Sequence, residues 1–305
     1  MYRLFTLAGA LTALLFTAIP ANGQVSDIFN GIQLGDSPAL VREKVAGLCE
    51  TLESHRPATV SFPLASETEE HLIGTNFSIH DGYMTLTEAV FVFADGRLVF
   101  IEMAGPGVQR LIDNEWYDGY RFYTGTDRMV IKEAQQRAWF LTEEALHPNL
   151  FAWSSPFLPS NGGREVSYST SAEVPAAFHM GGTQADLEPG LRGLSTFVAL
   201  QPEGEGEVQL NCFGIEFAGF PRKVEARFNE ENGLYLLWIL TGKQEEDRVR
   251  QALIATYGEA IYTSEEVEVF DDWRIILRKD RPEVAVVAPS MVPRFKGWIE
   301  SQGGE

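Results

Sequence analysis

The fold is decided by the run Ala89-Val90-Phe91-Val92-Phe93-Ala94-Asp95-Gly96-Arg97-Leu98-Val99-Phe100-Ile101, in which two apolar stretches flank the dipeptide Asp-Gly. Asp-Gly accepts positive φ at both central positions of a type I′ turn, whose twist matches that of paired antiparallel strands. The run therefore predicts a β-hairpin. Residues 89–93 do not alternate between apolar and polar side chains, so we expect this strand to be covered on both faces.

A second stretch of the chain has the same order of features. Lys223-Val224-Glu225-Ala226-Arg227-Phe228 is followed by the turn Asn232-Gly233 and by the apolar residues 234–240. Apolar and charged residues alternate in its first strand, which predicts one buried and one wet face. Upstream, His71-Leu72-Ile73-Gly74 matches Gln209-Leu210-Asn211-Cys212. The sequence therefore predicts two related modules.

A helix is expected before each hairpin. Ser37 is a good N-cap and Pro38 a good first helical residue. The apolar residues that follow at helical spacing are Val41, Val45, Leu48 and Leu52. In the second half, Thr183 is the expected cap of a weaker helix that Pro189 and Gly190 interrupt.

A clearer helix is expected after the second hairpin. Val249, Leu253 and Tyr257 share one helical face, and Gly258 is a plausible end. Residues 273–277 and 284–287 are predicted to be late strands. The whole pattern predicts an α+β architecture of two related modules, each an antiparallel sheet packed by helices.

Aromatic residues gather between the two modules. Ten of them lie between residues 116 and 157. We expect modules at 24–112 and 178–305, joined by an aromatic-rich helical connector at 113–177 with a helix near 127–146. Large aromatic side chains favour recognition, which makes Trp116, Tyr117, Tyr120 and Trp153 a candidate binding surface. The alternative is that they form a core between the modules.

The chain begins with an expected export signal, residues 1–23. Arg3 precedes an almost wholly apolar stretch at 4–19, and Ala21 and Gly23 fit a signal-peptidase site before Gln24. A membrane anchor is the alternative, but the stretch is short for a span. We expect a periplasmic or secreted protein with no membrane span after cleavage. The net charge of −19 argues against nucleic acid and anionic lipid as partners.

Two stretches of the sequence support a resemblance to exported bacterial proteins. The entry Gly31-Ile32-Gln33-Leu34-Gly35-Asp36-Ser37-Pro38 and the unit that follows it resemble the BamE-like small envelope lipoproteins over residues 29–104, and more loosely over 178–241. The segments Cys212-Phe213-Gly214-Ile215-Glu216-Phe217-Ala218-Gly219 and Arg281-Pro282-Glu283-Val284 are similar to uncharacterised exported proteins of Gram-negative bacteria. The first resemblance implies a module that binds other proteins. The chain departs from it by lacking a lipobox Cys, by its duplication and by its aromatic insert.

The chain contains two cysteines, Cys49 and Cys212. An oxidising compartment permits a disulfide between them, which would have to cross between the modules. Two buried unpaired thiols are the alternative. A redox role ranks last because neither residue lies in a Cys-x-x-Cys motif.

Sequence motifs of metal binding and catalysis are missing. The five histidines have no ligand spacing, and no nucleophile elbow, phosphate loop or dinucleotide fingerprint occurs. We therefore predict no metal, no cofactor and no catalytic residue. The leading hypothesis is an exported, non-catalytic envelope protein that binds a protein or glycan partner. The alternative is an exported hydrolase that acts on envelope glycans or peptides through dispersed carboxylates.

Overall fold

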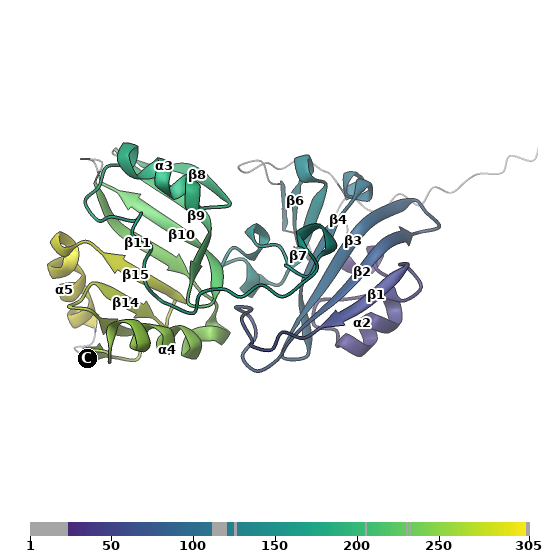
Figure 1. Ribbon diagram of the computed structural model, residues 1–305, viewed down its shortest axis with the longest axis horizontal. Coiled ribbons are helices and arrows are strands. Elements are labelled where there is room, and N and C mark those ends of the chain that lie inside the picture. The colour runs from purple at the N-terminus through teal and green to yellow at the C-terminus, as the bar shows by residue number, and fades with distance from the viewer. Residues whose placement is uncertain are drawn as a thin grey trace, which may run out of the picture.

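The structure is a computed structural model that describes residues 24–111, 121–124, 127–204, 206–229, 231 and 233–302. The chain has a mixed α+β fold built on two antiparallel sheets that stand side by side (Figure 1). The expected signal at 1–23 and the aromatics Trp116, Tyr117 and Tyr120 lie outside the described residues. Among the helices of the described ranges, none has the length and apolar character needed to cross a membrane.

The first sheet has seven strands in the order β1-β2-β3-β4-β7-β6-β5. Its strands are β1 (Thr51–His55), β2 (Glu69–Ile79), β3 (Met84–Ala94), β4 (Arg97–Ala104), β5 (Arg121–Thr124), β6 (Arg128–Lys132) and β7 (Arg137–Leu141). The hairpin predicted for β3 and β4 is confirmed, since Ala94 opposes Arg97 and both Asp95 and Gly96 have positive φ. The prediction that residues 89–93 are covered on both faces is also confirmed.

The second sheet has eight strands in the order β12-β13-β14-β15-β11-β10-β9-β8. Its strands are β8 (Phe197–Gly204), β9 (Glu207–Phe217), β10 (Phe220–Phe228), β11 (Leu234–Leu240), β12 (Tyr262–Thr263), β13 (Val267–Phe270), β14 (Ile275–Arg278) and β15 (Glu283–Val287). The predicted alternation of burial is confirmed in β10. Its hairpin with β11 has a longer connection than the turn expected at Asn232-Gly233, because Phe228 opposes Leu234 and Asn229 bonds Gly233.

The α-helices of the described residues are short. They are α1 (Val25–Ile28), α2 (Pro38–Val45), α3 (Gln184–Leu194), α4 (Glu246–Tyr257) and α5 (Val292–Gln302). Short 3₁₀ turns, η1 to η7, lie at Pro106–Leu111, Glu133–Gln135, Glu143–Ala145, Leu150–Ala152, Pro159–Asn161, Lys243–Glu245 and Pro289–Met291.

The predicted starts of α2 and α3 and the predicted end of α4 are confirmed, whereas the predicted length of α2 is wrong. The side chains of Ser37 and Thr183 cap α2 and α3, as predicted, although α3 continues through Pro189. α4 ends before Gly258, whose φ is positive. The expected continuation of α2 to Leu52 is wrong, because Leu52 pairs with Gly74 as part of β1.

The helix predicted near residues 127–146 is wrong. This stretch forms β6 and β7, joined by a turn in which Gln136 has positive φ. β7 pairs with β4 in the first sheet, and four of its five residues are buried, which a strand between two cores requires. The first part of the expected connector therefore belongs to the first sheet.

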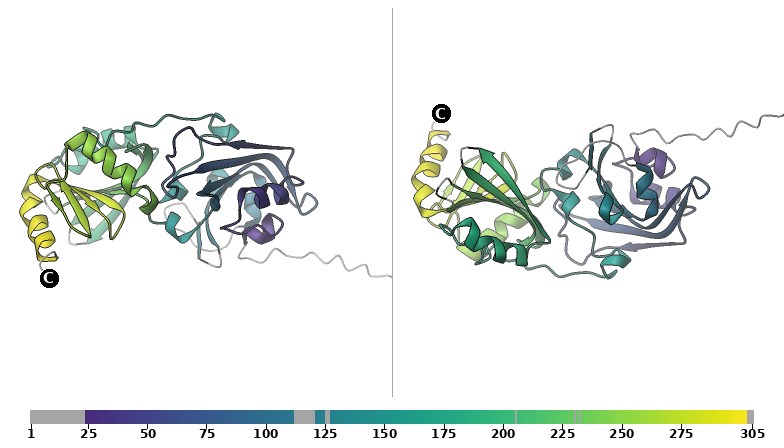
Figure 2. Two further views of the ribbon diagram at one scale, coloured as in Figure 1. Left: turned by 90° about the horizontal axis from the view of Figure 1, so that it is seen from below. Right: turned by 90° about the horizontal axis from the view of Figure 1, so that it is seen from above.

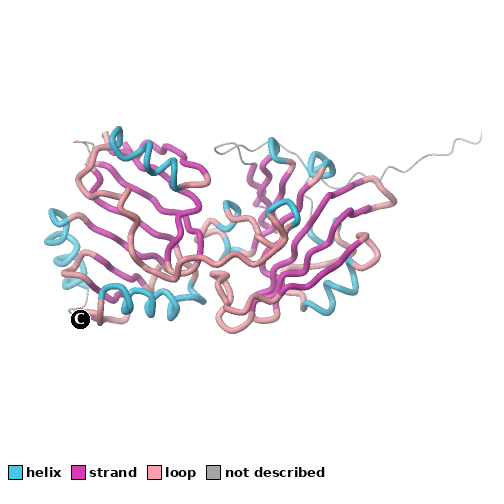
Figure 3. The backbone as a smooth tube through the Cα atoms, in the orientation of Figure 1, coloured by secondary structure: helices cyan, strands magenta, loops and turns pink. Residues whose placement is uncertain are grey.

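Four apolar clusters hold these layers together. One lies between the first sheet and α1 and α2, and one between the second sheet and α3 and α4. A third joins the two sheets through Phe62, Trp153 and Phe220, and a fourth packs α5 on the second sheet. Figure 2 shows α4 and α5 on different sides of the second sheet, and Figure 3 shows that loops link the two halves.

Candidate functional site

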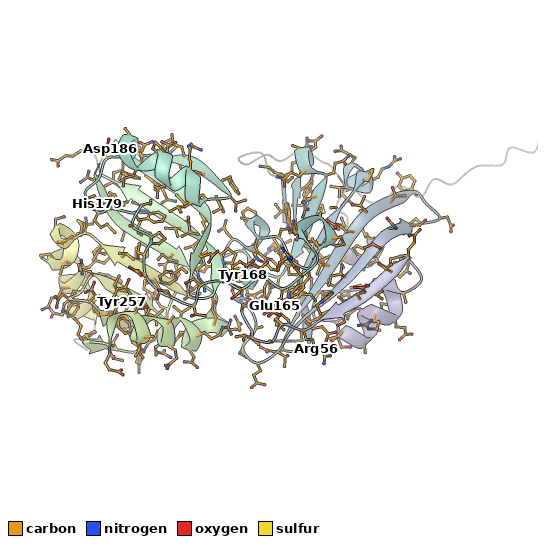
Figure 4. All side chains as sticks on the ribbon, in the orientation of Figure 1. Arg56, Glu165, Tyr168, His179, Asp186 and Tyr257 are labelled. Carbon is orange, nitrogen blue, oxygen red and sulfur yellow. The ribbon has the colours of Figure 1, made fainter. Side chains whose placement is uncertain are left out.

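A cavity of about 740 Å³ lies where the two sheets meet, and we call it the inter-sheet cavity. The first sheet contributes the β1–β2 connection and the start of β2, and the second contributes the β9–β10 turn and α4. The connecting segment 153–170 supplies the remaining wall. Glu165 and Tyr168 of this segment lie in the middle of the molecule, between the sheets (Figure 4). Ligand sites occur preferentially at such junctions.

Two polar side chains of β2 line the cavity from the first sheet. Residues two apart in a strand share a face, so Glu69 and His71 lie together, and His71 Nε2 is 2.7 Å from Glu69 Oε1. Glu69 Oε2 accepts the backbone N–H groups of Ser61 and Phe62. Burial alone would raise the pKa of Glu69, but these hydrogen bonds outweigh it and hold the pKa below its ordinary value. Glu69 is therefore a carboxylate, which only accepts, and His71 Nε2 carries a proton.

The other ring nitrogen of His71 contacts the connecting segment. His71 Nδ1 lies 3.1 Å from Ser155 Oγ, and both side chains are fully buried. In the tautomer with the proton on Nε2, Nδ1 accepts a hydrogen bond from the Ser155 hydroxyl. This contact joins β2 to a segment more than eighty residues further along the chain.

Ser155 is also held by a buried charge network on the same face of the first sheet. Glu102 accepts hydrogen bonds from the Ser155 backbone N–H at 3.0 Å and from the Ser154 hydroxyl at 2.6 Å. Arg137 pairs with Glu102 and donates to Ser154 and Ser160. Burial raises the pKa of Glu102, although Arg137 opposes the shift. The network fastens the segment that carries Trp153 to the sheet.

Glu69, His71 and Ser155 are the residue types of a serine-hydrolase triad, but their surroundings differ from a catalytic site. Ser155 is fully buried and does not line the inter-sheet cavity. Its backbone N–H donates to the Glu102 carboxylate, whereas acyl transfer needs free donors for a developing oxyanion. The three residues thus position the segment.

Trp153 is the one member of the candidate binding surface that the structure describes. Its side chain is 7% exposed and packs on Phe62, Phe100 and Phe220, so it belongs to the core between the sheets. It also lines the inter-sheet cavity. Its buried indole N–H lies near the Tyr168 hydroxyl but has no well-formed hydrogen bond. The structure does not describe Trp116, Tyr117 or Tyr120, so their place relative to Trp153 stays a prediction.

The second sheet reaches the cavity through α4. Arg248 donates to the carbonyl oxygens of Ala65 and Phe62 at 2.6 and 3.0 Å and lies 3.7 Å from Glu245. Gly242 packs so closely on Pro63 that a Cβ there would lie 2.1 Å from the Pro63 carbonyl oxygen. These contacts fix the β1–β2 connection against the second sheet and shape one wall.

Sequence reasoning missed Glu165, Tyr168 and Arg248 as residues of the site. Glu165 and Tyr168 lie in a stretch without helix or strand, and Arg248 sits on a helix that was recognised only by its apolar face. Nothing in their local pattern distinguishes them from solvated residues. The concentration of aromatic residues around Trp153 was the one available signal, because it placed these residues between the modules.

The structure does not bring the two cysteines together. Cys49 packs on the first core, Cys212 lies in the second, and both are free thiols. Burial raises the pKa of both, that of Cys212 to about 12. Such thiols are poor nucleophiles at neutral pH. Within the described ranges, no group of three or more His, Cys, Asp or Glu side chains is placed to hold a metal ion.

No protein-family model, curated protein or solved structure matches the chain.

Proposed function

We propose that the chain is an exported, non-catalytic binding protein of the cell envelope, and that its ligand enters the inter-sheet cavity. The observation that carries the proposal is the cavity itself, which both sheets line with aromatic residues such as Trp153 and with fixed polar groups such as Glu69 and His71. Concave sites with mostly apolar walls and a few fixed polar groups are typical of ligand binding.

The states of the buried carboxylates favour binding over acid catalysis. Glu69 has a lowered pKa and three hydrogen-bond donors, so it does not supply a proton at neutral pH. Glu102 has a raised pKa, as a general acid requires, but it is enclosed by Arg137, Ser154 and Ser155. The hydrolase alternative therefore has less support than binding.

The two halves are, in this proposal, related modules that enclose a site between them. In each half a capped helix precedes a four-stranded meander, and the last strand of the half returns to pair with the fourth strand of the meander. β2 and β9 have the same length, and the stretches at 71–74 and 209–212 lie at the same place in them. The second half adds α4 and β12, and α4 forms a wall of the cavity.

The experiment compares a variant that fills the cavity with one that does not. Ala255 is an exposed residue of α4 that lines the cavity, so Ala255→Trp adds bulk there without entering the core. Ala185 is an exposed residue of α3 outside the cavity, and Ala185→Trp is the matched control. Each tagged chain is crosslinked in the cell, purified and analysed by mass spectrometry.

The proposal predicts one dominant partner that Ala255→Trp loses and Ala185→Trp keeps. N-terminal sequencing of the purified chain tests export, with Gln24 as the expected first residue. A partner that both variants retain would place the binding surface elsewhere. If the natural chain hydrolysed an envelope polymer and Ala255→Trp abolished this activity, the binding proposal would be wrong and the hydrolase alternative would be supported.

A further inference from the structure

The segment that borders the inter-sheet cavity has backbone groups that pair with no other described residue. Arg164–Val174 has no helix or strand and crosses from the first half to the second (Figure 1). Its later part is fixed, because Gly219 donates to the carbonyl of Ser169 and Ala218 to that of Ser171. Within the described part of the chain, the backbone N–H and C=O groups of Val166, Ser167 and Tyr168 form no hydrogen bond. Unpaired backbone of this kind is what an added strand binds.

The charges around the cavity are unbalanced. Glu69, Glu165 and Asp247 contribute three carboxylates, whereas Arg248 is the lining residue with a permanent positive charge. The Arg248 guanidinium already meets two carbonyls and Glu245, and Asp247 is paired with Arg250. Glu165 accepts one long bond, 3.3 Å from the Ala58 N–H, and no Lys or Arg of the described ranges pairs with it. A positively charged group of a ligand would form an ion pair with the Glu165 carboxylate.

The apolar part of the cavity favours a ligand with large apolar side chains. Val60, Trp153, Phe157 and Val166 line it, and Val166 is one of the large apolar side chains that the chain exposes. The Trp153 indole N–H lacks a good acceptor, and an unsatisfied buried donor destabilises the free protein. A carbonyl oxygen of a ligand that reached the Trp153 indole would satisfy it.

We infer that the inter-sheet cavity binds an extended peptide segment that carries basic and apolar side chains. The peptide backbone pairs with residues 166–168, a Lys or Arg side chain meets Glu165, and an apolar side chain packs near Trp153. This inference rests on the proposed function and specifies its ligand class. Backbone pairing distinguishes a peptide from a small amine, which would use Glu165 alone.

The test uses defined peptides and the mature full chain. The probe is an acetylated and amidated hexapeptide of alternating Lys and Val, and its matched control has Glu in place of each Lys. n-Butylammonium tests whether a small amine is enough. Isothermal titration calorimetry is expected to show binding of the Lys peptide, at least tenfold weaker binding of the Glu peptide, and no binding of the amine.

Variants then assign the contacts. Glu165→Gln is expected to lower the affinity for the Lys peptide about three- to fivefold, as for the loss of an exposed ion pair. Val166→Pro is expected to lower it about fivefold, because proline has no backbone N–H to donate. Glu173→Gln makes the same charge change on an exposed residue of the segment outside the cavity and is expected to change nothing. Equal thermal midpoints across the series show that each variant is folded.

Two failures are distinguishable. If neither peptide binds while the crosslinked partner is still lost in Ala255→Trp, the cavity binds a ligand of another class and this inference is wrong. If no ligand or partner responds to Ala255→Trp, the proposed function fails as well. Equal binding of the Lys and Glu peptides would exclude the role of Glu165.

Discussion

β3 and β10 occupy the same place in their sheets, third in a four-stranded meander, yet they are buried differently. β3 is buried on both faces through residues 88–94, whereas β10 alternates buried and half-buried residues along its whole length. The second face of β3 lies under the segment that follows β7, which carries Trp153 and Ser155. The corresponding face of β10 presents Lys223 and Glu225.

One strand away, β2 and β9 are both buried at this place, and they differ instead in the partners of their polar residues. His71 and Gln209 are the third residues of β2 and β9. His71 contacts Ser155 of the connecting segment, while Gln209 contacts Asn211 and Arg227 of its own sheet. The difference teaches that the covering segment supplies the buried polar residues of the first sheet with partners, whereas those of the second sheet bond within their own sheet. The first sheet holds its connector through such contacts, and the second leaves the face polar.

The largest expected effect comes from breaking the covered face. Arg137→Ala removes the partner of the buried Glu102 and of Glu88, and we expect the free energy of unfolding to fall by about 3–5 kcal/mol. Arg227→Ala, on the corresponding face of the second sheet, removes one hydrogen bond to the buried Gln209 and is expected to cost about 1 kcal/mol. Urea unfolding measures both. Equal losses would mean that the two faces do not differ in the way proposed.

A second test uses the cysteines, which the two halves place differently. In the second half, Cys212 lies within hydrogen-bonding reach of Ser195 at the end of α3. In the first half, Cys49 faces Gly74, where the Phe77 ring leaves no room for a Cβ. Ser195→Cys is expected to form a disulfide with Cys212 and to stabilise the oxidised chain by up to about 3 kcal/mol.

Free thiols counted in denaturant measure this outcome. The oxidised Ser195→Cys chain is expected to retain one free thiol, that of Cys49, and Thr196→Cys serves as a neighbouring control that retains all of its thiols. Three free thiols in Ser195→Cys would show that residues 195 and 212 are too far apart for a bond.

Smaller effects are expected at the junction between the halves. Gly242→Ala places a Cβ against the Pro63 carbonyl, and the displacement is expected to cost about 1–3 kcal/mol. Gly193→Ala, in α3 with open space around it, is the control and is expected to stabilise by up to about 1 kcal/mol. Thermal unfolding compares the two. A neutral Gly242→Ala would show that the two halves are not packed at this point.

Much of the fold could be predicted from local sequence. Asp95-Gly96 predicted a hairpin because its turn needs no distant partner, and Ser37, Thr183 and Gly258 predicted helix ends for the same reason. Residues 127–146 were misassigned because β7 pairs with β4, a contact with a strand distant in the chain that local sequence does not show. Leu52 was misassigned for a similar reason, since it pairs with Gly74.

The candidate site was harder to predict than the fold. Trp153 was found because aromatic residues concentrate near it, whereas Glu165, Tyr168 and Arg248 converge only when the two sheets are placed side by side. Glu69 and His71 lie two residues apart, and this spacing shows a shared strand face but not the segment that covers it. Burial by a distant segment leaves no local signal.

The smallest effect expected is a pH dependence that comes from the second sheet. Glu283 is buried beside Arg278, and burial raises its pKa from 4.5 to about 6 in spite of that partner. A carboxyl group whose pKa is higher in the folded state binds its proton more tightly there, so stability rises as the pH falls from about 6 to 4.5. At pH 8 the ionised Glu283 therefore lowers the free energy of unfolding, by at most about 2 kcal/mol.

Glu283→Gln imitates the protonated group and tests this directly. We expect the variant to be more stable than the natural chain at pH 8 by about 1 kcal/mol, because lost pairing with Arg278 offsets part of the gain, and the advantage to disappear near pH 4.5. Glu265→Gln changes an exposed residue of the same half and is expected to follow the natural chain at every pH. An advantage of Glu283→Gln that grew on acidification would reverse the sign and show that Arg278 outweighs burial. Glu102 in the first sheet is likewise buried, but it pairs with Arg137 and accepts hydrogen bonds from two serines. The result for Glu283 would then show whether one arginine alone is enough to stabilise a buried carboxylate in the second sheet.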